Sequence, residues 1–305
     1  MKPRRRRPLS PRELRERRSS RNLRLATVGV GVVALLAVGG VLVATRVNPP
    51  LGDDLCPADR EPAAEVVVLL DATDPWNATQ RAAIRGEFER IRNAVPRFAR
   101  VRLFALEESL DGLPTPAVAL CNPGTENDFA SVPVLGRLSA RFFANPARLE
   151  QWRGGFETAL DDMLSAVADD AGGRASPIME TVRGIALEAF PTRAPVVRAG
   201  TASGTPRPGD VTAADRRLYV FSDMLQHTDA YSHYRASAWS TGDAERLADV
   251  AAAGTARLGD VAIEIFLLDR GIRGEGRGPG ALAEFWEAWF AEQGAVVERV
   301  RRMEG

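Results

Sequence analysis

The sequence predicts an α/β fold: a doubly wound, mainly parallel sheet with helices on both faces, preceded by one transmembrane helix. Two observations lead to this fold class. Short continuous apolar runs alternate with longer segments of helical periodicity, which is typical of parallel strands buried on both faces. Ahead of this alternation, residues 25–45 form a run of 21 uncharged residues, LATVGVGVVALLAVGGVLVAT.

The uncharged run predicts a membrane anchor. At about 1.5 Å per residue it is long enough to cross a hydrocarbon core of about 30 Å. Residues 1–24 carry 11 basic and two acidic side chains, a net charge of +9, so the positive-inside rule keeps this basic tail in the cytoplasm. The rest of the chain is then expected on the periplasmic or extracellular side of the cell (inner) membrane, in a single-pass topology. A cleaved signal peptide is the alternative, although its apolar region spans only about 7–15 residues.

The charge of the remaining chain limits the class of partner. The whole chain carries 40 basic and 40 acidic residues, so the part after residue 24 has a net charge of −9. An acidic body argues against nucleic-acid binding, which requires a positive surface. Residues 46–63 contain four prolines and are expected to act as a linker, and residues 64–305 are expected to form the extracytoplasmic domain.

The two cysteines, Cys56 and Cys121, both lie on the expected outer side of the membrane. An even number of cysteines in an oxidising compartment suggests one disulfide. Two unrelated buried thiols are the alternative.

The order of apolar and periodic segments gives the expected elements. In the first helix, for example, Ile84, Phe88, Ile91 and Val95 are spaced to lie on one face. The expected strands are residues 65–70, 101–106, 117–121, 218–221, 261–268 and 295–300. The expected helices are residues 78–95, 146–169, 177–190, 244–253 and 279–293, and Ser176 is expected to cap the third of these with Pro177 at its first position.

Polar residues gather at three points where strands end or helices begin. They are the segments DATDP (residues 71–75), GRASP (residues 173–177) and SD (residues 222–223). In a doubly wound sheet these segments can converge beyond the carboxyl ends of the strands. Carboxylate and hydroxyl oxygens together form a site of the kind that magnesium prefers. The alternative is that these residues only cap helices and shape turns.

With these segments, the chain resembles the von Willebrand factor type A (vWA) family. That family holds a divalent ion with an Asp-x-Ser-x-Ser after the first strand, a central Thr and an Asp after the fourth strand. The resemblance implies that Asp71, Thr73, Ser176 and Asp223 are the metal ligands. Pro75 departs from the pattern, because it stands at the second hydroxyl position and has no side-chain oxygen.

The resemblance implies a binding module that takes a protein partner outside the cytoplasm, with Mg²⁺ or Mn²⁺ as the bound ion that the family's site would hold. One alternative is a metal-dependent hydrolase that uses Asp71 and Asp223. Another is a structural subunit of an envelope complex with no metal. His227 and His233 are expected on a surface loop beside the site, because zinc sites have more ligands at closer spacing.

Overall fold

The computed structural model describes residues 49–108, 112–124, 145–169, 175–190, 216–252, 258–272 and 274–303, together with Val28, Leu35 and Gly39. The chain divides into two compact units, Met1–Pro50 and Leu51–Gly305. Apart from those three residues, the expected membrane helix at residues 25–45 lies outside the described part of the chain. Within the described part, no helix combines the length and the apolar character that a membrane span requires.

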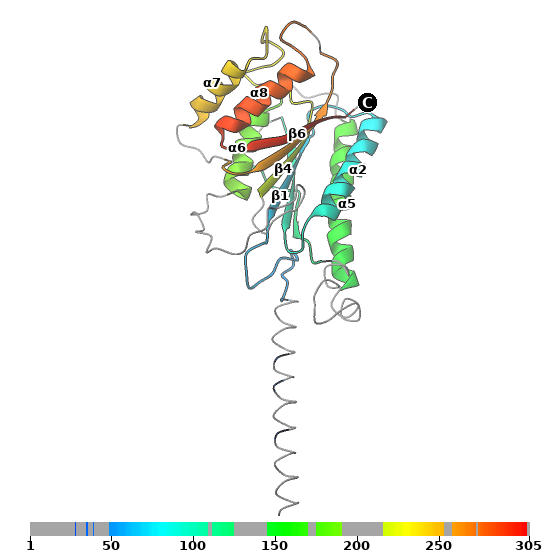
Figure 1. Ribbon diagram of the computed structural model, residues 1–305. Helices are drawn as coiled ribbons and strands as arrows, with labels where there is room; N and C mark the ends of the chain where they lie inside the picture. The colour runs from blue at the N-terminus through cyan, green and yellow to red at the C-terminus, as the bar shows by residue number, and fades with distance from the viewer. Residues whose placement is uncertain are drawn as a thin grey trace, which may run out of the picture. The chain divides into compact units, whose positions relative to one another are not determined.

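The second unit alternates strands and helices in the order that the sequence predicts (Figure 1). The strands are β1 (Glu65–Asp71), β2 (Arg100–Leu106), β3 (Val118–Cys121), β4 (Arg216–Ser222), β5 (Ala262–Leu268) and β6 (Val296–Met303). The helices are α2 (Ala78–Ala94), α5 (Pro146–Asp169), α6 (Ile178–Ala189), α7 (Thr241–Ala252) and α8 (Pro279–Glu292).

The strands form one sheet in the order β3-β2-β1-β4-β5-β6. All neighbouring strands are parallel except β2 and β3, which are antiparallel. This confirms the mainly parallel sheet. The chain moves outward from β1 to β3 and then returns to place β4 on the other side of β1, so the direction of winding reverses between β1 and β4. In sheets of this kind, ligands bind beyond the carboxyl ends of the strands at that reversal.

Helices cover both faces of the sheet, as expected (Figure 1). Alternate strand residues point to opposite faces. Val67 and Leu69 of β1 belong to the core shared with α6, α7 and α8. Val66 and Val68 belong to the core shared with α2 and α5. The sheet is therefore buried on both sides, which explains why its central strands are continuously apolar.

Helix α2 illustrates how the local sequence defines an element. Asn77 and Gln80 form a reciprocal capping box: each side chain accepts a hydrogen bond from the backbone N–H of the other residue. Ile84, Phe88 and Ile91 are buried at helical spacing on the face that meets the sheet. The cap sets where the helix begins, and the apolar stripe sets which face packs.

The segment expected to be a linker packs against the domain from Leu51 onward. Leu55 is buried in the core on the α2 side, and the backbone oxygen of Asp53 accepts a hydrogen bond from Gln151 of α5. Cys56 and Cys121 form the expected disulfide, with their Cα atoms 4.8 Å apart. The disulfide and the burial of Leu55 hold this backbone on the domain.

Candidate functional site

Two of the residues expected to bind metal lie next to each other at the reversal of the sheet. Asp71 is the last residue of β1, and Asp223 directly follows β4, the neighbouring strand. Between them Ser222, the last residue of β4, donates a hydrogen bond from Oγ to Oδ2 of Asp71 at 2.5 Å. The site is therefore built where the carboxyl ends of two adjacent parallel strands meet.

Asp71 is buried and accepts hydrogen bonds on both carboxylate oxygens. Thr73 donates to Oδ1 from its backbone N–H at 3.1 Å and from its hydroxyl at 2.7 Å, and Ser222 donates to Oδ2. Burial raises the pKa of Asp71, and the hydrogen bonds from Ser222 and Thr73 partly oppose that rise. Asp71 and Thr73 are thus held together by two hydrogen bonds.

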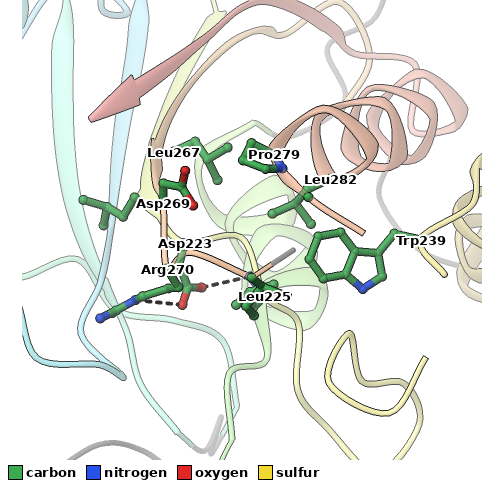
Figure 2. A pocket seen from close by; sticks show the side chains of 11 residues that line it. Asp223, Leu225, Trp239, Leu267, Asp269, Arg270, Pro279 and Leu282 are labelled. Carbon is green, nitrogen blue, oxygen red and sulfur yellow. Dashed lines mark hydrogen bonds and ion pairs between the residues drawn. The ribbon is translucent and has the colours of Figure 1, made fainter. Parts of the chain in front are cut away.

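Asp223 is also buried, with 5% of its surface exposed. Its Oδ1 accepts a hydrogen bond from the backbone N–H of Leu225 at 2.9 Å, and its Oδ2 accepts one from Nε of Arg270 at 3.2 Å (Figure 2). Burial first, and then the charge of Asp71, raises the pKa of Asp223 to about 7. The two carboxyl groups are close enough to affect each other's ionisation.

Arg270 is a site residue that the sequence analysis missed. It follows β5 and extends its side chain over the end of β4 to the loop after β1. There its Nη2 lies 3.5 Å from Oδ2 of Asp74, and its Nη1 donates to the backbone oxygen of Pro75 at 3.4 Å. Its position directly after a buried parallel strand was a usable signal, but its reach depends on the strand order.

Ser176 is tied to the same edge through its backbone. It exchanges two hydrogen bonds with His227, at 2.8 and 2.9 Å. Its hydroxyl is buried and has no hydrogen-bond partner within the described part of the chain. The expectation that Ser176 caps α6 is wrong: Pro177 is the N-cap residue, and the side chain of Gln226 accepts a hydrogen bond from the N–H of Met179 instead.

The two histidines lie in different environments, and the expectation of a surface position is wrong for His233. That side chain is fully buried among aromatic rings, which include Tyr231, Trp239 and Phe285. Burial lowers its pKa to about 3. His227 is half-buried, and its Nδ1 lies 2.7 Å from the hydroxyl of Ser232. The buried ring was missed because the loop after β4 folds back under α8.

At this edge, backbone N–H groups, two hydroxyl groups and Arg270 donate hydrogen bonds to the carboxylate oxygens that are expected to bind a divalent ion. All four carboxylate oxygens of Asp71 and Asp223 already have protein hydrogen-bond partners. Pro75 adds no side-chain oxygen. In the described residues no group of three or more His, Cys, Asp and Glu side chains could hold a metal. Binding of Mg²⁺ or Mn²⁺ stays a prediction, with Ser176 as the one expected ligand whose oxygen is unpaired among the described residues.

The hollow beside Asp223 and Arg270 is small. Its volume is about 240 Å³, including space open to solvent, and Trp239, Pro279 and Leu282 are among the residues that line it (Figure 2). Because that volume includes open solvent, the part that a ligand could fill is far smaller than the roughly 300–1,000 Å³ of pockets that usually enclose small molecules. This edge of the sheet therefore presents a shallow surface rather than an enclosing pocket.

Comparisons with known proteins do not identify a family. No family model matches the chain, and no curated protein matches it. Among solved structures, 29 chains match. One is the crystal structure of an aerotolerance-related membrane protein from Bacteroides fragilis NCTC 9343 with multiple mutations to serines. It is 11% identical, with a TM-score of 0.33, over 79% of this chain and 92% of that chain. A similarity this weak supports no conclusion about function.

Proposed function

We propose that this chain is a membrane-anchored, extracytoplasmic vWA-like module that binds a protein partner at the carboxyl edge of its sheet. The anchor is residues 25–45, and the basic tail before it remains in the cytoplasm. The disulfide between Cys56 and Cys121 is consistent with an oxidising compartment. Asp71, Thr73 and Asp223, three of the four residues that resemble the vWA site, meet at the reversal between β1 and β4, which supports this choice of surface.

The single observation that carries the proposal is that the buried carboxyl groups of Asp71 and Asp223 are surrounded by partly exposed side chains, which we call the rim. The buried carboxyl groups are satisfied by hydrogen bonds within the protein, and the adjoining hollow is too small to enclose a typical ligand. At the rim, Tyr234 is 48% exposed, and the side chains of Asp74 and Arg270 are partly exposed. Burial first, and then the charges of Asp223 and Asp74, raise the pKa of Tyr234 to about 12. Aromatic and charged side chains grouped in this way suit a protein interface.

The alternatives use the same surface differently. A metal-dependent hydrolase with Asp71 and Asp223 requires room for both a hydrated ion and a substrate, and the hollow of about 240 Å³ does not favour it. A structural subunit of an envelope complex would dock permanently, with no metal. The lifetime of the complex with the partner would distinguish such a permanent subunit from a module that binds its partner reversibly.

Photo-crosslinking from the rim tests the proposal. Tyr234 is replaced by a benzophenone amino acid in the full-length chain in its own membrane, and Val296 is replaced in the same way as the control. Val296 is 62% exposed at the amino end of β6, and so lies at the end of the sheet opposite to the carboxyl ends of the strands. We expect one protein adduct from position 234 and none from position 296, and we expect Asp74→Lys to abolish the adduct. Adducts from position 296 alone would place the interface elsewhere.

A further inference from the structure

We infer that the guanidinium of Arg270 occupies the place of a divalent metal ion at the carboxyl ends of β1 and β4. A metal ion therefore binds there only when Arg270 is removed. The inference rests on the site of the proposed function, because it concerns the same carboxyl groups. Its test requires no partner, so it can fail or succeed independently.

The reach of Arg270 is the first argument. Its own strand, β5, is separated from β1 by β4, which places the two strand ends about 10 Å apart. The side chain covers this distance and contacts both loops, with Asp223 at 3.2 Å and Asp74 at 3.5 Å. The positive charge therefore lies between the carboxyl groups that follow β1 and β4, at the place where the vWA resemblance puts the metal ion.

Charge balance is the second argument. Asp71 and Asp223 lie at the carboxyl ends of adjacent strands, and Asp74 lies on the loop after Asp71, so their negative charges repel one another when ionised. Arg270 opposes this repulsion through its ion pairs with Asp223 and Asp74. Because arginine remains protonated at all ordinary pH values, the compensation is permanent and does not depend on the concentration of any metal.

The third argument links Arg270 to the departure from the vWA pattern. Pro75 removes the second hydroxyl oxygen from the expected metal shell. The backbone oxygen of the same residue accepts a hydrogen bond from Nη1 of Arg270. The position that lacks the ligand is thus a position that holds the guanidinium. The two changes are complementary: fewer metal ligands and a tethered cation.

Metal-dependent thermal unfolding of the full-length chain in detergent tests the inference. The variants are Arg270→Gln and, as a matched control, Arg246→Gln, which removes an exposed arginine that pairs with Asp243 on α7. With EDTA or with millimolar Mg²⁺ or Mn²⁺, the wild type and Arg246→Gln should show the same Tm. Arg270→Gln should melt lower in EDTA. Its Tm should rise by about 3–6 °C once free metal is about tenfold above Kd.

Two further measurements keep the inference open to refutation. The double variant Arg270→Gln with Asp223→Asn should lose the metal response, because a carboxylate ligand is gone. Arg270→Lys keeps a charge without the planar fork and should also show no metal response. If Arg270→Gln does not fold, titration of Mn²⁺ into Arg270→Lys and wild type, followed by electron paramagnetic resonance, should show no bound ion in either. A metal-dependent rise in the wild type equal to that of Arg270→Gln, no rise in either protein, or bound Mn²⁺ in wild type would each overturn the inference.

Discussion

At the amino ends of the strands, the sheet is held by a disulfide and by exposed ion pairs, whereas at the carboxyl ends it is held by hydrogen bonds to buried carboxyl groups. Cys121 ends β3 beside the first residue of β2, at the amino edge. At the same edge, Arg216 at the start of β4 pairs with Asp260, whose side chain is 86% exposed. At the carboxyl edge, Asp71 and Asp223 are both buried.

The contrast shows where precise placement of polar groups is required. An exposed ion pair contributes little, because water and salt screen it. A buried carboxyl group destabilises the fold unless its partners are in place. We therefore expect exposed charged residues of the amino edge to tolerate substitution, and we expect the carboxyl edge to depend on each hydrogen-bond donor of its buried carboxyl groups.

Removal of the disulfide should have the largest effect on stability. Replacing both Cys56 and Cys121 with Ser opens a loop of 65 residues, which corresponds to about 4 kcal/mol in the chain-entropy model. Urea unfolding of the full-length chain in detergent measures the loss. Reducing agent should destabilise the wild type by the same amount and leave the double variant unchanged. A loss below about 1 kcal/mol would show that the core alone holds the amino edge.

Ser222→Ala should have the next largest effect, about 3 kcal/mol. The change leaves Oδ2 of buried Asp71 without its donor and the N–H of Met224 without its acceptor. Ser176→Ala is the matched control, because the hydroxyl it removes is also buried but has no partner among the described residues. Its stability should stay within about 0.5 kcal/mol of wild type. Equal losses in the two variants would contradict the picture of a carboxyl edge ordered by Asp71.

Acid should destabilise the fold through His233, which lies in the loop that follows the carboxyl end of β4. Its pKa is about 3 in the folded protein and about 6.5 in an unfolded chain. The unfolded state therefore takes up a proton first as the pH falls below 6.5, and the folded state loses about 2 kcal/mol by pH 5.

The control for this effect is His233→Phe, which fills the aromatic cluster without a titratable group. Asp223 has the opposite influence, because its raised pKa favours the folded state as the pH falls below 7. Asp223 is present in both proteins, so its contribution cancels in the comparison. The loss of stability between pH 7 and pH 5 should be smaller in the variant by about 2 kcal/mol, and parallel pH profiles would rule out the role of His233.

The smallest effect is expected at the amino edge. Asp260→Ala removes the exposed partner of Arg216 and should change stability by less than about 0.5 kcal/mol. Raising the salt concentration should reduce even that difference. A loss comparable to that of Ser222→Ala would remove the distinction between the two edges.

The part of the fold that could be predicted from the sequence is the part that short stretches of the chain specify. The apolar run before Asp71 and the periodic residues Ile84, Phe88 and Ile91 place β1 and α2 within one or two residues of their observed bounds. The apolar runs that precede Asp71 and Asp223 place both residues at strand ends. The short strand β3 was also expected, but its antiparallel direction was not, since periodicity carries no information about direction.

The amino-acid sequence alone determines three features of this protein: the order of its elements, its α/β class and the end of the sheet at which the polar residues lie. Each of these follows from interactions between near neighbours in the chain, which periodicity, charge runs and the residues at element ends record. Which strands are adjacent depends on long-range packing. Only that packing brings Ser222 to Asp71, 151 residues earlier in the chain, and Arg270 to Pro75, 195 residues earlier. It also buries His233 beneath α8. The partners of each carboxyl group, and hence the chemistry of the site, come from the tertiary structure.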